Sequence, residues 1–202
     1  MTATDLSAAL ERLDEITRKL RKECPWDREQ DERSIVPHTV EEAYELADAA
    51  ESGDDAKLLD ELGDVLFQVY FLGLLMEERG AGSLADVADL VRAKLIRRHP
   101  HVFGQVEAAS AGDVVRNWNQ IKRDDERGGE IFGPIPENLP ATLYAKKVLK
   151  RAESAGFRLD AGSQDAGERL LAAVRDAVDA GVDPELALRR AADRFKDEVS
   201  GA

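Results

Sequence analysis

The chain has 202 residues, 41 acidic against 28 basic, and a formal net charge of −13. It is long enough to bury a hydrophobic core, and scarce aromatic residues (5%) among long Ala, Leu, Glu, Lys and Arg runs favour an all-α class. The acidic balance argues against nonspecific binding of a nucleic-acid polymer, which needs a basic surface. It does not exclude binding of a single nucleotide.

One cysteine, Cys24, rules out an intrachain disulfide and indicates a reducing compartment. The first residues lack a signal-peptide pattern. No apolar run approaches the roughly 20 residues of a membrane helix. The sequence therefore predicts a cytoplasmic protein with no membrane partner.

Apolar spacing of three and four residues predicts a series of helices: 5–22, 38–51, 55–79, 84–98, 113–126, 140–155, 166–180 and 184–199. A Cys-Pro-Trp-Asp turn at 24–27 ends the first helix, and residues 28–37 are predicted to be a loop. On helix 55–79, an apolar stripe that includes Leu62 and Val69 is predicted to face the core. Glycines and prolines divide the chain into a helical domain (1–127), a linker (128–138) and a smaller helical region (139–202).

The segment 39–69 carries the pattern on which the functional interpretation depends. Glu42 and Glu45 lie three residues apart on the first helix, and Glu61 and Asp64 lie three apart on the second, so each pair shares a helix face. If the chain reverses near residues 53 and 54, the two pairs lie at the same height and face each other. Four converging carboxylates repel unless a cation joins them.

A solvated helix face is the simplest alternative for these acids, and the register across the turn argues against it. Oxygen ligands suit Mg²⁺ or Mn²⁺. A di-iron bundle would need Glu-x-x-His on its helices, but Asp48 and Phe67 stand at those histidine positions.

Several motifs, in order, make residues 5–126 resemble the MazG family of nucleoside triphosphate pyrophosphohydrolases. They are Cys-Pro-Trp-Asp-Arg-Glu-Gln (24–30), Glu-Glu-x-x-Glu (41–45), Glu-Leu-Gly-Asp-Val-Leu-Phe-Gln-Val (61–69), Lys-Leu-Ile-Arg-Arg-His-Pro-His-Val-Phe (94–103) and Asn-Trp-Asn-Gln-Ile-Lys (117–122). The resemblance implies the all-α helical bundle of that superfamily. Residues 139–199 are similar to a degenerate second copy that lacks both carboxylate motifs, and we expect it to be catalytically inactive.

The resemblance also implies the activity, which is Mg²⁺-dependent hydrolysis of nucleoside triphosphates to the monophosphate and pyrophosphate, a cleansing of the nucleotide pool. Mn²⁺ is a possible substitute ion. The metal ligands map onto Glu42, Glu45, Glu61 and Asp64, and Glu41 is either a group just outside the ligands or a candidate base. The family commonly forms homodimers, so a homodimer is expected.

Positive charge for the substrate's phosphates is predicted at the end of helix 84–98, where Lys94, Arg97 and Arg98 cluster. Cations are favourable at any helix C-terminus, so only the resemblance makes them phosphate ligands. Lys57 is a weaker candidate.

Trp118, with Lys122 one turn later, could offer an indole face to a nucleobase, although core packing is the default for a tryptophan. The resemblance implies that Trp118 contacts the nucleotide. Trp26 is expected to be a structural plug, and His99 and His101 are expected to be structural and to bind no metal.

A function from another class remains open at this point. The degenerate second half is also compatible with a non-catalytic helical protein that binds nucleotides or regulates a partner. The complete carboxylate set of the first half favours the enzyme.

Overall fold

The structure, a computed structural model, describes residues 3–127, 130–159, 162 and 165–201. These residues contain helices and no strand, which confirms the all-α prediction. The helices are α1 (Ala3–Glu23), α2 (Pro25–Glu29), α3 (Glu32–Ser52), α4 (Asp55–Glu78), α5 (Leu84–Arg98), α6 (Pro100–Phe103), α7 (Ala111–Arg127), α8 (Ala141–Ser154), α9 (Ala166–Asp179) and α10 (Pro184–Ser200).

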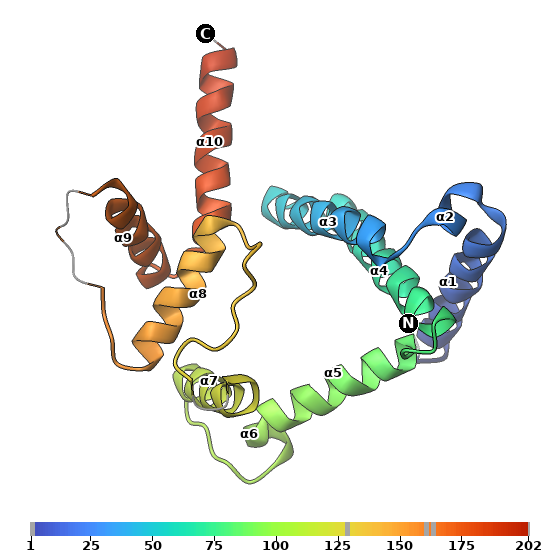
Figure 1. Ribbon diagram of the computed structural model, residues 1–202, viewed down its shortest axis with the longest axis horizontal. Coiled ribbons are helices and arrows are strands. Elements are labelled where there is room, and N and C mark those ends of the chain that lie inside the picture. The colour runs from blue at the N-terminus through green and yellow to red at the C-terminus, as the bar shows by residue number, and fades with distance from the viewer. Residues whose placement is uncertain (1–2, 128–129, 160–161, 163–164, 202) are drawn as a thin grey trace. The chain divides into compact units, whose positions relative to one another are not determined.

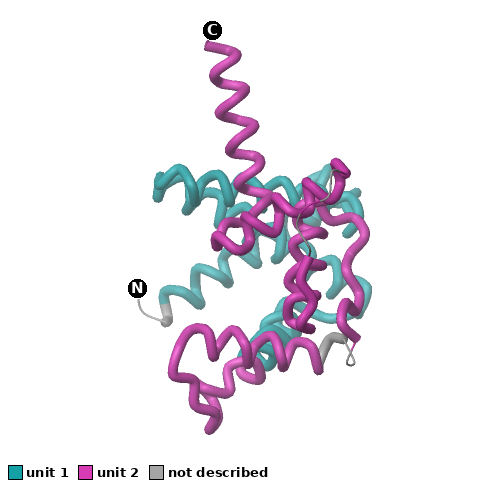
Figure 2. Tube along the Cα trace, turned by 90° about the vertical axis from the view of Figure 1, so that its left-hand side faces the viewer, with its two compact units in different colours: residues 1–95 teal, residues 96–202 magenta. Residues whose placement is uncertain are grey.

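The helices fall into two compact units, residues 1–95 and 96–202, which Figure 2 colours separately. Helix α5 crosses the boundary between the units. The predicted domain limits of 1–127, 128–138 and 139–202 stay a prediction. Their end points at 1, 128 and 202 lie outside the described residues.

Helices α3 and α4 form a hairpin and pack side by side in the first unit (Figure 1). Gly53 turns the chain with a φ of 71°. Residues that have a Cβ atom rarely adopt this left-handed backbone conformation. Asp54 then caps α4, because its carboxylate accepts hydrogen bonds from the N–H groups of Ala56 (2.9 Å) and Lys57 (3.2 Å). This two-residue connection sets the register of one helix against the other.

The predicted loop over 28–37 is wrong for most of its length, because α3 begins at Glu32. Asp31 accepts hydrogen bonds from the N–H groups of Arg33 and Ser34, both at 2.9 Å, and the Ser34 hydroxyl accepts from the Asp31 N–H. This reciprocal capping box stabilises the helix start, and Pro37 is accommodated inside the helix at the cost of a backbone N–H donor. His38, the first residue of the predicted helix, therefore lies inside α3.

The core of the first unit lies between α3 and α4, where Ile35, Phe71 and Leu75 are buried and Phe67 and Leu72 pack against them. Helix α1 is joined to α4 by two ion pairs, Arg18–Glu77 at 2.7 Å and Arg21–Glu78 at 2.8 Å.

The guanidinium of Arg21 also holds the short helix α2 in place. It donates hydrogen bonds to the carbonyl oxygens of Asp27 and Gln30, the latter at 3.0 Å. One side chain therefore connects α1, α4 and the turn that precedes α3.

The predicted core stripe on α4 is wrong at two of its positions. Leu62 is 48% exposed and Val69 is 39% exposed. The side of α4 that is buried instead carries Glu61, Gln68 and Phe71 among its residues. Helix α4 is apolar on more than one side, so spacing alone could not identify the side that faces α3.

In the second unit, helices α8, α9 and α10 pack together around Val174, which is buried. Lys146 on α8 pairs with Asp183 at the start of α10, and the Thr142 hydroxyl donates to Glu185. Residues 191–200, in the C-terminal part of α10, are all exposed. In Figure 1 this part of the helix extends away from α8 and α9.

The capping of α3 gives a first test. Replacing Asp31 with Ala removes the acceptor for two backbone N–H groups, so we expect a loss of about 1 kcal/mol in the free energy of unfolding. Urea denaturation followed by circular dichroism measures it. Asp48→Ala, at an exposed position within the same helix, serves as the control and should change stability much less.

Candidate functional site

Three carboxylates converge on one spot in the α3–α4 hairpin. Glu42 and Glu45 on α3 and Glu61 on α4 each offer an oxygen, and these oxygens all lie within 4.8 Å of one another. Glu61 is only 8% exposed, Glu42 is half-buried and Glu45 is exposed. We call these three residues the carboxylate triad.

The sequence produces this convergence through helix periodicity and the turn. Glu42 and Glu45 are one turn apart on α3, and the reversal at Gly53 and Asp54 brings Glu61 opposite them. The core residue Phe71 lies on the buried side of α4, as Glu61 does, so packing holds Glu61 against α3. The structure thus brings together three of the four predicted metal ligands.

The electrostatics of the triad disfavour its fully charged state. Burial raises the pKa of Glu42 above the ordinary glutamate value, and the negative charges of Asp64, Glu45, Glu61 and Glu41 raise it further. Burial likewise raises the pKa of Glu61, as does the charge of Glu45, while the Lys57 ammonium opposes the increase. Desolvation and nearby negative charges both disfavour the ionised form of a carboxylate. A bound cation would favour the ionised form again.

Asp64 and Lys57 border the triad along α4. Asp64 is exposed, and the described cluster of close oxygens does not include it. Its charge nevertheless acts on both Glu42 and Glu61. Lys57, Asp60 and Asp64 line an open depression of about 660 Å³ on the same helix.

Glu41 is separate from the triad. Its side chain is 67% exposed, and its Oε2 lies 3.8 Å from Nδ1 of His38, one turn earlier on α3. A carboxylate at this place can accept a proton or orient a water molecule beside the triad.

The predicted phosphate-binding cations lie on α5. Lys94 and Arg97 are exposed, whereas Arg98 is buried. Lys94 belongs to the first unit, and Arg97 and Arg98 belong to the second. Their role as phosphate ligands stays a prediction.

Trp118 is half-buried in the second unit and belongs to a small cluster of rings and charge. Its ring centroid lies 4.9 Å from that of His99 and 5.3 Å from the guanidinium carbon of Arg98. His101 lies 5.5 Å from His99, between ring centroids. These contacts give the two histidines packing partners, and their structural role stays a prediction. Lys122, also half-buried, follows Trp118 by one turn of α7.

The expectation that Trp26 is a buried plug is wrong, because its side chain is 53% exposed. Its ring packs against His38, with ring centroids 6.0 Å apart and an interplanar angle of 66°. Sequence reasoning placed His38 at the start of helix 38–51 but gave it no role, because its contact with Trp26 joins two different helices. The signal that could have found it is its spacing of seven residues from Glu45, which is two helical turns.

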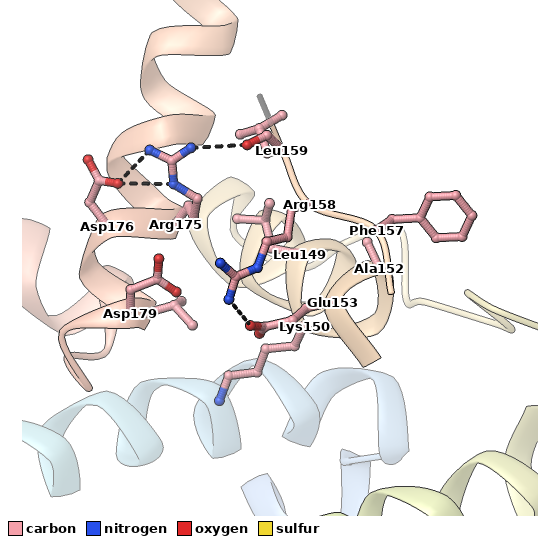
Figure 3. A pocket seen from close by; sticks show the side chains of 11 residues that line it. Leu149, Lys150, Ala152, Glu153, Phe157, Arg158, Leu159, Arg175, Asp176 and Asp179 are labelled. Atoms are coloured by element: carbon pink, nitrogen blue, oxygen red, sulfur yellow. Dashed lines mark hydrogen bonds and ion pairs between the residues drawn. The ribbon is translucent and has the colours of Figure 1, made fainter. Parts of the chain in front are cut away.

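The second unit contains a pocket of about 300 Å³ between α8 and α9, shown in Figure 3. Its charges are largely neutralised within the pocket. Arg175 donates to Asp176 at 2.7 Å and to the Leu159 carbonyl at 3.2 Å, and Arg158 pairs with Glu153 at 3.4 Å. Like charges therefore do not converge there as they do in the carboxylate triad, and the triad is the stronger candidate site.

None of the described helices is both long enough and apolar enough to span a bilayer.

Comparison with known proteins identifies the family of the chain. The family profile described as the MazG nucleotide pyrophosphohydrolase domain matches residues 30–103, which include α3, α4 and α5.

Relatives extend the similarity over most of the chain. A Thermotoga maritima protein named nucleoside triphosphate pyrophosphohydrolase/pyrophosphatase MazG is 34% identical over 212 residues, covering 92% of this chain and 82% of that protein. The Escherichia coli K12 nucleoside triphosphate pyrophosphohydrolase is 39% identical over 154 residues, covering 73% of this chain and 59% of its own length. An uncharacterized 26.1 kDa protein of Streptomyces cacaoi is 39% identical, with 93% and 80% covered.

Among solved structures, a MazG-related protein from Thermotoga maritima aligns with 56% of this chain and 98% of its own, at 26% identity and a TM-score of 0.49. The family assignment rests on the sequence relatives, above all on the 82% of the Thermotoga maritima MazG protein that the chain covers. The chain belongs to the MazG nucleotide pyrophosphohydrolase family.

Proposed function

We propose that the protein hydrolyses nucleoside triphosphates to the nucleoside monophosphate and pyrophosphate, and that Mg²⁺ is the ion it uses, with Mn²⁺ as a substitute. The observation that carries the proposal is the carboxylate triad, three oxygens within 4.8 Å with one of them on a buried side chain. The names of the E. coli and Thermotoga maritima relatives support the same reaction. Removal of unwanted triphosphates from the nucleotide pool is the role that fits.

The residues present fit a hard divalent cation. Carboxylate oxygens are the ligands such ions prefer, and the raised pKa values of Glu42 and Glu61 reflect repulsion that positive charge relieves. We assign the ligands as Glu42, Glu45, Glu61 and Asp64. When bound, the ion screens the phosphate charge, acidifies a water molecule and stabilises the leaving pyrophosphate.

In the proposed reaction the oxygen of a water molecule forms a bond to the α-phosphorus, and the bond from that phosphorus to the α,β-bridging oxygen breaks. Glu41 is the group we assign to accept the water's proton or to orient that water, because it is exposed one residue from Glu42. The monophosphate keeps the new oxygen, and pyrophosphate leaves with the bridging one.

Cations must balance the charge of a triphosphate. We assign this role to Lys94, Arg97 and Arg98, with Lys57 as an additional contact beside Glu61. Arginine offers paired N–H donors that match phosphate oxygens. We also propose that Trp118 and Lys122 contact the nucleotide, which rests on the family motif at 117–122.

We propose that the region 139–202 is an inactive second copy and that the protein works in the cytoplasm. Neither the Glu-Glu-x-x-Glu nor the Glu-x-x-Asp motif recurs in that region. The single cysteine is compatible with a reducing compartment.

A homodimer is also proposed. It is supported by an exposed apolar stripe on α4, which shares Leu62 and Val69 with the predicted core stripe. Leu59, Leu62, Leu66 and Val69 follow one another at helical spacing and are between 38% and 74% exposed. An apolar stripe of this kind is typical of a surface that another protein covers.

Activity is tested by product analysis. With Mg²⁺, the purified protein should release pyrophosphate, and not orthophosphate, from several nucleoside triphosphates. Glu42→Gln and Glu61→Gln should each abolish turnover with the helical circular dichroism spectrum retained, since each removes a charged ligand. Glu15→Gln, an exposed position on α1, is the matched control and should remain active.

Wild-type rates in both glutamine variants would remove these residues from the site. Orthophosphate as the direct product would contradict the proposed reaction. Calorimetric binding of nucleotide with no hydrolysis would support the alternative, a non-catalytic nucleotide-binding protein.

The pKa of Glu61 gives a stability prediction with a definite sign. A carboxyl whose pKa is raised on folding favours the folded state below its unfolded pKa, about 4.3, and loses that contribution as the pH rises through the folded value. Glu61→Gln should therefore raise the melting temperature of the metal-free protein at neutral pH, and the difference should shrink toward pH 4.

The effect of Mg²⁺ on the melting temperature is the matched measurement. It should raise the melting temperature of the wild type, by an amount that grows with concentration, and have less effect on the Glu61→Gln variant. A variant that is less stable than the wild type at neutral pH without metal would contradict this account of the repulsion.

The dimer is tested on its proposed interface. Leu62→Glu puts a charge into the stripe, so the variant should sediment as a monomer where the wild type sediments as a dimer. Leu6→Glu, at an exposed leucine on α1, is the control and should leave the mass unchanged. A wild type that is monomeric at high micromolar concentration would overturn the proposal.

A further inference from the structure

Trp26 and His38 form an exposed aromatic pair in the first unit. Their ring centroids are 6.0 Å apart and the rings meet edge to face at 66°. In such an arrangement each ring keeps at least one face that the other does not cover. Trp26 is 53% exposed, and the His38 side chain is 47% exposed.

His38, the member of the pair on α3, lies on the helix face that carries Glu42 and Glu45 of the carboxylate triad. At about 100° per residue, His38, Glu42 and Glu45 fall within one narrow sector of α3. His38 precedes Glu42 by four residues, a rise of about 6 Å along the helix axis. Its ring also lies 3.8 Å, atom to atom, from the Glu41 carboxylate. An aromatic surface is therefore present about one turn from the proposed metal ligands.

The fold does not depend on the exposed indole to hold α2. The backbone around Trp26 is fixed by other groups: Arg21 donates to the carbonyls of Asp27 and Gln30, and the Gln30 side-chain amide donates to the Trp26 carbonyl at 2.8 Å. Asp27, and not Trp26, is the buried residue of α2. An anchored backbone that presents a half-exposed indole is preorganised for contact with a ligand.

From these observations we propose that Trp26 and His38 form the surface on which the nucleobase of the triphosphate stacks. The inference rests on the proposed function for the position of the phosphates at the triad, and it adds a base-binding element in the first unit that is independent of Trp118. A stacking surface accepts any base through its π-face. The predicted substrate class is thus broad in base identity and dependent on the presence of a base.

The test separates base binding from chemistry. Steady-state kinetics would compare ATP with ribose 5-triphosphate, which lacks only the base, for the wild type, Trp26→Leu and His38→Ala. Loss of a stacking contact should raise the KM for ATP roughly fivefold or more, with kcat nearly unchanged and with no change in KM for ribose 5-triphosphate. Trp26→Phe, which keeps a ring, should restore most of the affinity. Phe195→Leu, an exposed aromatic on α10, is the matched control.

Binding without turnover supplies a second readout. The chain has two tryptophans, so in Trp118→Phe the only indole is Trp26. A non-hydrolysable α,β-methylene analogue of ATP should change its fluorescence, and ribose 5-triphosphate should not. His38→Ala in that background should weaken the response.

The outcomes distinguish this proposal from the proposed function. Turnover with an unchanged KM for ATP in both Trp26→Leu and His38→Ala would overturn the stacking surface alone. A fluorescence response that requires the base, without pyrophosphate release by the wild type, would overturn the proposed function and support the surface. No calorimetric binding of the analogue to the wild type, which keeps Trp118, would overturn both.

Discussion

The mutual repulsion of the carboxylate triad is the constraint on which the rest of this structure depends. Three like charges within 4.8 Å are unfavourable by themselves, so the hairpin must hold them together by other means. It does so with the Gly53–Asp54 turn, which fixes the register, and with the Ile35–Phe71–Leu75 core, which keeps α4 against α3. A bound cation would relieve this repulsion.

In the second unit, two acidic residues at the start of α10 are paired with cations and hydrogen-bond donors. Burial by itself would raise the pKa of Asp183, but the Lys146 ammonium and the N–H groups at the start of α10 lower it below the ordinary aspartate value. Glu185 accepts from Thr142 and pairs with Arg189 at 3.1 Å. Here acids are paired with cations and donors and serve as structural contacts, which fits the proposal that this region is an inactive copy.

Much of the site followed from residue spacing. The three-residue steps and the turn near residue 53 were sufficient to predict that Glu42, Glu45 and Glu61 converge. Spacing could not show that Asp64 stays exposed outside the closest oxygens, because that depends on the rotation of α4 about its axis. The same uncertainty made the core stripe wrong, since apolar residues occupy more than one side of α4.

The region before α3 shows a different limit of sequence reasoning. Pro37 suggested a loop because proline disfavours helix interiors, yet the capping box at Asp31 and Ser34 offsets the lost hydrogen bond and starts the helix six residues earlier than predicted. Local capping therefore decided where α3 begins. The contact of Trp26 with His38 joins α2 to α3, so residue spacing within one helix could not predict it.

Helix α4 joins the proposed site to the proposed dimer. It carries Glu61 on its buried side and the apolar stripe on another, and successive residues such as Glu61 and Leu62 differ by about 100° around the axis. Full burial of a leucine stabilises by roughly 1.5–3 kcal/mol, so covering the stripe with a second copy would add stability to the helix that bears the repulsion. The proposed dimer would thus support the helix that holds Glu61 beside Glu42 and Glu45.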